Sequence, residues 1–251
     1  MSPARPRIAY LFSRYPIISQ TFCDNEILGL EDAGWDLVIG SLNPPQEDFR
    51  HRRLDTLRAP VIYSPPSAVL RELEANATAD KSWPQELIDD HARRLGESTR
   101  PELRCRNALG VAQAFRRLGV EHVHLHFANR AAHSAIFLTH LTGIPFSFTP
   151  QAQDFLIDIE PELLAEICRE AAFVIAPCDY AKAKLGEMCP DSADKMFRVY
   201  NGIPPASYPE SKPAPSEQRV RVVSCGRLIE FKGFQHLIAA SALAAKQSVR
   251  V

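Results

Sequence analysis

The feature that most constrains the fold is a regular alternation of short apolar runs with helical stretches. The run Ile8 to Phe12 is apolar at every position, which is typical of a strand buried on both faces of a parallel sheet. A helical stretch follows and stops near Gly34, and Trp35 to Leu42 predicts a second strand. A strand, a helix and a strand in this order predict a parallel β-α-β unit with a right-handed crossover.

The same alternation continues through most of the chain. We predict further strands at Pro60–Tyr63, Val123–Phe127, Phe146–Thr149, Phe173–Ala176 and Met196–Tyr200, and further helices at Pro101–Leu118, Ala131–Leu141, Pro161–Ala171 and Asp179–Met188. A polar stretch with helical character, 69–100, is interrupted by Pro84. Strands that alternate with helices predict the fold class α/β, with a Rossmann-like doubly wound parallel sheet.

A proline-rich break divides the chain. The segment Pro204 to Glu217 has five prolines among its fourteen residues and no apolar periodicity. A strand at Val220–Cys225 and a helix from Gly233 to about Lys246 follow it. We therefore predict an N-terminal domain over 1–203, a linker over 204–218 and the first β-α unit of a second Rossmann-like domain over 219–251. One such unit cannot bury its own faces, so we expect the second domain to be incomplete and the chain to be truncated.

Composition excludes several classes of protein. The net charge of −1 gives no electrostatic reason for nucleic-acid binding. The six cysteines have spacings that predict neither a disulfide framework nor a zinc site, and we expect reduced thiols in a cytoplasmic protein. No apolar run approaches the ~18 residues of a spanning helix.

The loop after the first strand, residues 12–22, contains no glycine. It is therefore not the G-x-G-x-x-G fingerprint of nicotinamide and flavin enzymes. Ser19 and Thr21 stand near a predicted helix start, where they could bind a sugar or an anion of an acceptor. The alternative is helix capping, with Asp24 completing a capping box after Thr21.

Three histidines share one face of the strand at 123–127. His122, His124 and His126 alternate with apolar residues, and no carboxylate or cysteine nearby in the sequence completes a ligand set, so we predict no metal site. His126 ends the strand at the edge where ligands of α/β sheets bind. It is either a hydrogen-bonded structural residue or an acceptor-binding group.

The turn between the last strand and helix has the residues that a diphosphate needs. Gly226 and Gly233 allow close approach of the backbone, and Arg227 and Lys232 supply two cations beside a helix start. A charged surface turn is the competing interpretation.

Four segments in order resemble one known family. They are FSRYPIISQTFCDNEILGLEDAGWDLVIGSL (12–42), HVHLHFANRAAHSAIFLTHLTGIPFSFT (122–149), VYNGI (199–203) and VSCGRLIEFKGFQHLI (223–238). Together they resemble the family 4 (group 1) glycosyltransferases of GT-B fold, closest to those of colanic acid and other exopolysaccharide biosynthesis.

The resemblance implies an enzyme that needs no cofactor. It would transfer a sugar, with retention of configuration, from a UDP- or GDP-sugar to a glycan or lipid-linked acceptor in the cytoplasm, at times at the inner face of the membrane. The N-terminal domain would hold the acceptor, and Arg227 and Lys232 the donor diphosphate. Catalytic residues are expected in Thr149–Asp154, where Gln151 replaces the family's usual histidine and Asp154 is kept.

Two alternatives stay open at this stage. The family's E-x7-E motif has no counterpart before Val251, so the chain could instead be a non-catalytic module that holds an acceptor or a partner transferase. A sugar-nucleotide epimerase is the third interpretation. The arginines 104, 106, 116 and 117 could touch a membrane, with a solvated helix face as the alternative. The sequence predicts no oligomeric state.

Overall fold

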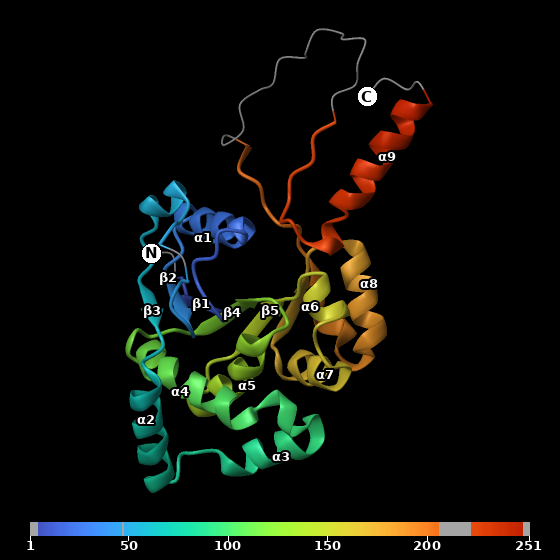
Figure 1. Cartoon of the computed structure of the whole chain (residues 1–251). Coiled ribbons are helices and arrows are strands. Elements are labelled where there is room, and N and C mark those ends of the chain that lie inside the picture. The colour runs from blue at the N-terminus through green and yellow to red at the C-terminus, as the bar shows by residue number, and fades with distance from the viewer. Residues whose placement is uncertain (1–4, 47, 206–221, 248–251) are drawn as a thin grey trace. The chain divides into compact units, whose positions relative to one another are not determined.

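The computed structural model describes residues 5–46, 48–205 and 222–247. The chain divides into two compact units, Met1–Ile203 and Pro204–Val251 (Figure 1). The predicted linker at 204–218 falls almost entirely outside the described residues. No helix in the described ranges is both long enough and apolar enough to cross a bilayer.

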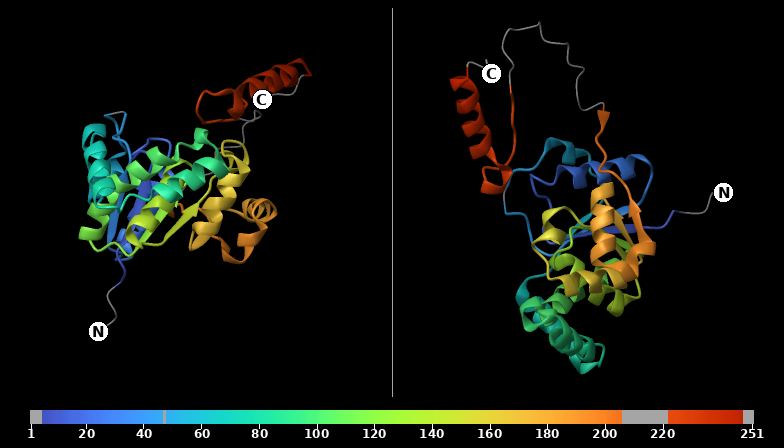
Figure 2. Two further views of the ribbon diagram at one scale, coloured as in Figure 1. Left: turned by 90° about the horizontal axis from the view of Figure 1, so that it is seen from below. Right: turned by 90° about the vertical axis from the view of Figure 1, so that its right-hand side faces the viewer.

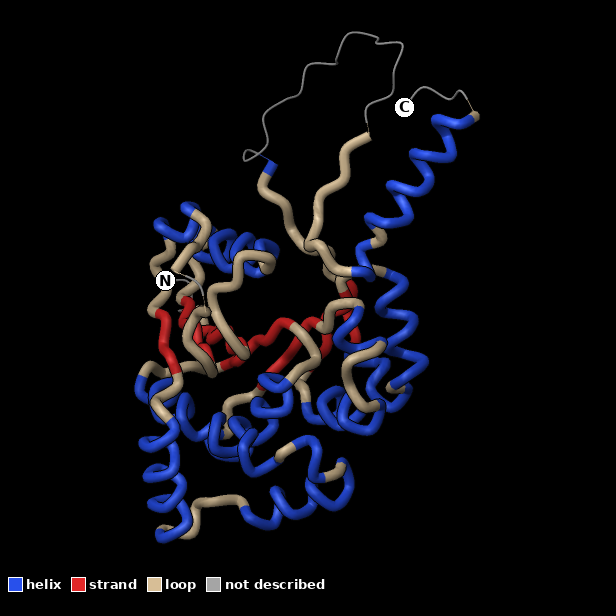
Figure 3. The backbone as a smooth tube through the Cα atoms, viewed as in Figure 1, coloured by secondary structure: helices blue, strands red, loops and turns tan. Residues whose placement is uncertain are grey.

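The first unit is built on one parallel sheet, which confirms the predicted fold class. Seven strands pair in the order β3-β2-β1-β4-β5-β6-β7 and form a continuous band in Figure 3. The strands are β1 (Ile8–Phe12), β2 (Leu37–Ser41), β3 (Val61–Tyr63), β4 (His122–His126), β5 (Phe146–Thr149), β6 (Phe173–Ala176) and β7 (Met196–Arg198). The predicted strands at 35–42 and 196–200 are therefore shorter than expected.

The helices cover both faces of this sheet. They are α1 (Thr21–Asp32), α2 (Ser67–Ala79), α3 (Gln85–Leu95), α4 (Pro101–Arg117), α5 (Arg130–Thr142), α6 (Gln153–Leu156), α7 (Pro161–Glu170) and α8 (Asp179–Met188). Figures 1 and 2 show α1 on one side of the sheet and α4 and α5 on the other. The short α6 was not predicted, because four residues carry no helical periodicity.

Alternation along β1 divides the core into two layers. Ala9 and Leu11 belong to the larger cluster, which includes residues of α4 and α5. Tyr10 and Phe12 point the other way and belong to a smaller cluster with Ile27 of α1. Both faces of the strand are therefore buried, as the continuous apolar run predicts.

The second unit is described over 222–247 only. Helix α9 (Phe234–Lys246) agrees with the predicted helix, and Gly233 adopts a left-handed φ of 72° just before it. The prediction of a strand over 220–225 is not met at residues 222–225, which have no regular secondary structure. A strand needs a paired neighbour, and the described part of this unit supplies none.

Gly40 lies where a helix side chain packs directly against the sheet. A Cβ on Gly40 of β2 would lie 2.6 Å from Cζ of Phe115 of α4, whereas a Cβ on Gly29, within α1, would meet nothing within 4 Å. We expect Gly40→Ala to destabilise the protein by about 1–3 kcal/mol through overpacking. The matched change Gly29→Ala should stabilise it by about 0.5–1 kcal/mol through helix propensity. Urea unfolding followed by circular dichroism measures both; equal effects would contradict this packing.

His124 predicts a dependence of stability on pH. Its ring is buried between strands, with Nδ1 2.8 Å from Ser147 Oγ and Nε2 3.1 Å from Thr149 Oγ1, and burial lowers its pKa to about 3. The unfolded state, with an ordinary pKa near 6.5, therefore takes up a proton first as the pH falls. Stability should decrease between about pH 6.5 and 3, by up to about 1.4 kcal/mol per pH unit from this group.

Comparison of variants isolates that contribution. We expect the pH slope of the unfolding free energy to be shallower in His124→Asn than in the wild type, whatever the loss of absolute stability. His140 is exposed at the end of α5, and His140→Asn should leave the slope unchanged. An unchanged slope in His124→Asn would mean that the ring takes up its proton at the same pH in the native and the unfolded state, contrary to the lowered pKa.

Candidate acceptor site

The reversal of strand order places one site in the first unit. The chain builds the sheet outward from β1 to β2 and β3, and then returns to β4 on the other side of β1. The loops that leave β1 and β4 therefore diverge at the carboxyl edge, where ligands of open α/β sheets bind. Two pockets lie at this edge, and Arg104 and Arg130 line both.

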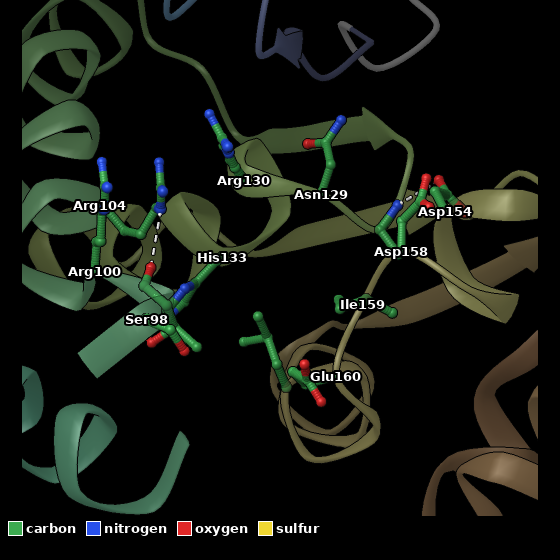
Figure 4. Close-up of a pocket in the computed structure, with 13 residues that line it drawn as sticks. Ser98, Arg100, Arg104, Asn129, Arg130, His133, Asp154, Asp158, Ile159 and Glu160 are labelled. Atoms are coloured by element: carbon green, nitrogen blue, oxygen red, sulfur yellow. Dashed lines mark hydrogen bonds between the residues drawn. The ribbon is translucent and has the colours of Figure 1, made fainter. Parts of the chain in front are cut away.

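The first pocket has a volume of about 560 Å³ and lies beside the start of α5. Figure 4 shows Arg100 and Arg104 on one side of it and Asp154 and Asp158 on the other, with Asn129 and Arg130 between them. The second pocket, of about 800 Å³, is bordered by the segments after β1, β2 and β3. Its lining includes Ser13, Arg14, Asn43, Ser64, Arg104 and Arg130.

Arg104 is a buried cation at the wall between the pockets. The residue is only 7% exposed, and its Nε donates a hydrogen bond of 3.2 Å to the carbonyl oxygen of Thr99. Burial lowers the pKa of Arg104 to about 10, helped by the positive charges of Arg130 and Arg100. No carboxylate lies within ion-pair distance of these three arginines in the described ranges.

Asp154, a predicted catalytic residue, joins two loops at the pocket. Its Oδ2 accepts from the backbone N–H of Ala128, after β4, over 2.7 Å, and its Oδ1 accepts from Gln151, after β5, over 2.8 Å. Burial raises the pKa of Asp154 to about 7, against the opposing effect of these backbone donors. A carboxyl group that titrates near neutrality suits proton transfer.

Gln151, the other predicted catalytic residue, lies next to this junction without lining either pocket. Its side-chain Nε2 is buried and has no hydrogen-bond partner. An unpaired buried amide costs free energy, which is a reason to expect a partner in the working complex. Its catalytic role is not tested by the geometry and stays a prediction.

Backbone strain concentrates at the same place. Phe127, Ala152 and Arg100 have positive φ angles of 77°, 39° and 54°, and they are three of the four non-glycine residues with positive φ in the part of the chain that is described. Phe127 precedes Ala128, Ala152 precedes the α6 segment with Asp154, and Arg100 lines the pocket. Such strain gathers at functional sites, where the surrounding structure enforces it.

Ser19 and Thr21, predicted to bind the acceptor, lie in and after the loop that leaves β1. Ser19 is exposed, and α1 begins at Thr21 with Gln20 as its N-cap and without a side-chain hydrogen bond to the cap. The capping-box alternative is therefore wrong, and Asp24 is instead buried. Neither residue lines the two pockets, and the acceptor role of both stays a prediction.

His126, the third predicted acceptor residue, is buried rather than exposed at the edge. The residue is 1% exposed, stacked against Tyr10 and Phe12, and its Nε2 lies 3.5 Å from Oε1 of Glu26. It lines neither pocket. The side chain cannot touch a ligand in this conformation, so the burial argues against the acceptor-binding role.

A carboxylate does approach the histidine face, contrary to the sequence interpretation. Glu26 comes from α1, and its oxygen lies with nitrogens of His124 and His126 within 4.8 Å of one another. Burial raises the pKa of Glu26, but His126, His124 and Tyr10 lower it to about 2 overall. Both nitrogens of His124 face hydroxyl groups and Tyr10 donates to Glu26, so these two ligand groups are engaged with the protein. The buried nitrogens of His126 have no hydrogen-bond partner among the described residues.

The four arginines considered for membrane contact differ in their surroundings. Arg104 is buried and lines the pockets, so neither a membrane face nor a solvated face describes it. Arg106 pairs with Glu74 and Glu102. Arg116 and Arg117 are exposed, as the solvated-face interpretation predicts, and membrane contact stays a prediction. Sequence analysis missed Arg100 and Arg130 as pocket residues. A signal existed for Arg130, because it follows the N-cap Asn129 directly after a predicted strand.

The predicted diphosphate residues belong to the second unit. Arg227 and Lys232 are exposed, and Gly233 forms the left-handed N-cap of α9. A Cβ on Gly226 would lie 3.4 Å from the ring of Phe234, so the glycine fits closely against the start of the helix. The geometry agrees with a turn that leads into a helix, and the binding role stays a prediction.

Solved structures show similar folds over part of their length. The chain is similar to Anabaena HepE in complex with UDP-glucose (12% identity, TM-score 0.50), covering 79% of this chain and 44% of that one. It is also similar to the lipopolysaccharide outer core galactosyltransferase WaaB (13% identity, TM-score 0.48), covering 78% of this chain and 46% of that one. A third similar structure is Acinetobacter baumannii MurG (14% identity, TM-score 0.44), covering 81% of this chain and 48% of that one. The chain thus spans less than half the length of each. No curated protein matches the sequence.

The comparison with protein families is more specific. The model described as Glycosyltransferase Family 4 matches residues 19–207, which include every strand of the sheet after β1. The match also includes the lining of the first pocket and that of the second except for Ser13, Arg14 and Ile17. This match covers most of the chain, and the parallel sheet agrees with it. The chain therefore belongs to glycosyltransferase family 4.

Proposed function

We propose that this chain is the acceptor-side domain, with the beginning of the donor-side domain, of a retaining glycosyltransferase. It transfers a sugar from a UDP- or GDP-sugar to a glycan or lipid-linked acceptor in polysaccharide biosynthesis, of the colanic acid or exopolysaccharide type. The observation that carries the proposal is the family match over 19–207 together with pockets at the carboxyl edge of its sheet.

The acceptor belongs in the first unit on this proposal. A sugar acceptor needs polar groups that converge on a concave surface, and the pockets supply guanidinium, carboxylate, amide and hydroxyl groups. Asp154 is the group best placed to exchange a proton there, because its pKa lies near neutrality and its carboxyl lines the pocket. Gln151 is the second catalytic residue of the proposal, and its amide N–H₂, which is buried and unpaired in this conformation, must become accessible to bond a sugar.

The donor belongs in the second unit. The diphosphate of a sugar nucleotide gains negative charge as the bond to the sugar breaks, so cations and helix N-termini stabilise the transition state. Arg227, Lys232 and the start of α9 are the groups that do this in the proposal, with Gly226 and Gly233 allowing the approach. The six free cysteines support a cytoplasmic location, where donor and acceptor would meet with no cofactor.

Nucleotide binding tests the donor side. We expect the full chain to bind UDP or GDP, and the double change Arg227→Gln/Lys232→Gln to weaken that binding at least about tenfold, since charged hydrogen bonds to phosphate are lost. Isothermal titration calorimetry measures both. Lys246→Gln, at the far end of the same helix, removes an exposed charge and should leave the affinity unchanged. Equal affinity in all variants would contradict the diphosphate assignment.

Turnover separates the enzyme from its alternatives. With UDP-glucose or GDP-mannose and a set of oligosaccharide acceptors, we expect acceptor-dependent release of the nucleotide and a product with the donor's anomeric configuration by NMR. Nucleotide and glycan binding without turnover would favour a binding module. Conversion of the donor sugar without an acceptor would favour an epimerase.

Asp154 also has a structural effect that is measured separately. Asp154→Asn leaves one backbone N–H, of Ala128 or Gln151, facing an amide N–H₂, so we expect a loss of about 1–3 kcal/mol in unfolding free energy. Asp158 is exposed and, among the residues that the structure describes, accepts only from the side chain of Gln153, so Asp158→Asn should cost little. Urea unfolding of both variants checks the difference. Equal stabilities would show that Asp154 does not link the loops after β4 and β5 through these hydrogen bonds.

A further inference from the structure

We infer that the first pocket binds a phosphate-type anion, and that the acceptor of this transferase carries a phosphate or diphosphate group. The inference rests on the proposed function only for the statement that the anion belongs to an acceptor. The anion site itself is argued from Arg100, Arg104 and Arg130 and from two helix N-termini at the same pocket.

The three arginines are placed where cations are costly. Arg100 is the N-cap of α4 and Arg104 lies one turn later, while Arg130 is the first residue of α5. The N-terminus of a helix carries partial positive charge, so a cation there is repelled rather than attracted. The first turn of α5 has no acidic residue to offset this repulsion. The arrangement therefore costs stability in the free protein.

Two other arginines of the same unit, Arg106 and Arg94, are neutralised by carboxylates, which makes the contrast with Arg104 informative. Arg106, also on α4, pairs with Glu74 and with Glu102, the acidic residue of that helix's first turn. Arg94 of α3 pairs with Asp90 and Glu166. Arg104 is more deeply buried than either, yet within the described residues it donates to one backbone carbonyl, that of Thr99, and pairs with no carboxylate. A buried charge without a counter-charge is stable only where something else offsets its desolvation.

The chemistry of this pocket selects its ligand. Guanidinium groups donate paired hydrogen bonds that match phosphate oxygens, and helix N-termini add backbone N–H groups and a favourable field. The opposite side of the pocket carries Asp154 and Asp158, which accept hydrogen bonds from hydroxyl groups (Figure 4). A molecule with an anionic end and a hydroxylated body, such as a sugar phosphate, fits both sides. The volume of about 560 Å³ is in the range of small-molecule sites.

Direct binding without a donor tests the inference. Inorganic pyrophosphate and glucose 1-phosphate are titrated into the full chain at fixed ionic strength, with glucose as the uncharged comparison. We expect saturable binding of both anions and at least about tenfold weaker binding in Arg130→Gln and in Arg100→Gln. These side chains are exposed, so the variants should fold. Arg117→Gln, exposed at the other end of α4, removes the same charge and should bind as the wild type does.

Stability gives a second readout that a plain surface arginine would not change. Without ligand, Arg130→Gln should melt at a higher temperature than the wild type because repulsion is relieved, and pyrophosphate should raise the melting temperature of this variant less than that of the wild type. A lower melting temperature with unchanged anion binding would overturn the inference.

Further binding experiments determine where the anion binds and whether it comes from a soluble or a lipid-linked molecule. Loss of pyrophosphate binding in Arg227→Gln/Lys232→Gln, with full binding in Arg130→Gln, would assign the anion to the donor turn and overturn the inference. Tight binding of glucose 1-phosphate supports a soluble sugar phosphate. Arg130-dependent binding to phosphatidylcholine vesicles containing polyprenyl phosphate, but not to vesicles without it, supports a lipid-linked one. Anion binding without any sugar transfer would leave this site in place and contradict the proposed function instead.

Discussion

The structure depends on the point where the parallel sheet reverses its direction of growth. Because β1 lies between β2 and β4, the segments after β1 and β4 must leave the carboxyl edge in opposite directions. A space therefore stays open between these two segments at the edge of the sheet. The two pockets share Arg104 and Arg130 at this edge, so the site follows from strand order before any particular side chain is considered.

One carboxyl group, that of Asp154, links the two loops at this edge and acts as a clamp between them. Asp154 accepts hydrogen bonds from the backbone after β4 and after β5, and the residues nearby at Phe127 and Ala152 adopt positive φ. Each strained conformation costs about 1–3 kcal/mol, which the clamp and the surrounding core must offset. A carboxyl group that fixes two loops and also titrates near pH 7 couples the shape of the pocket to its protonation state.

The sequence predicts the sheet well because its signals are local. Short apolar or alternating runs, such as Ile8–Phe12 and Val123–Phe127, locate every strand of the first unit between helices with Gly or Pro at their ends. The site is predicted less well, because its residues meet only through topology. Arg100, Arg104 and Arg130 come from two helices, and nothing in their spacing shows a common pocket. Glu26 likewise reaches His124 and His126 from a helix about 100 residues earlier in the chain.

His126 shows how a correct position can mislead about a role. Its place at the carboxyl end of β4 is as predicted, but Tyr10, Phe12 and Phe22 surround its ring and leave no access. Period 2 decides only which face of the sheet a side chain is on, and that face is covered by α1. The residues that reach ligands at such an edge lie just beyond the strand, where the chain has left the sheet. Arg130, four residues after His126, is in that position, and it lines both pockets.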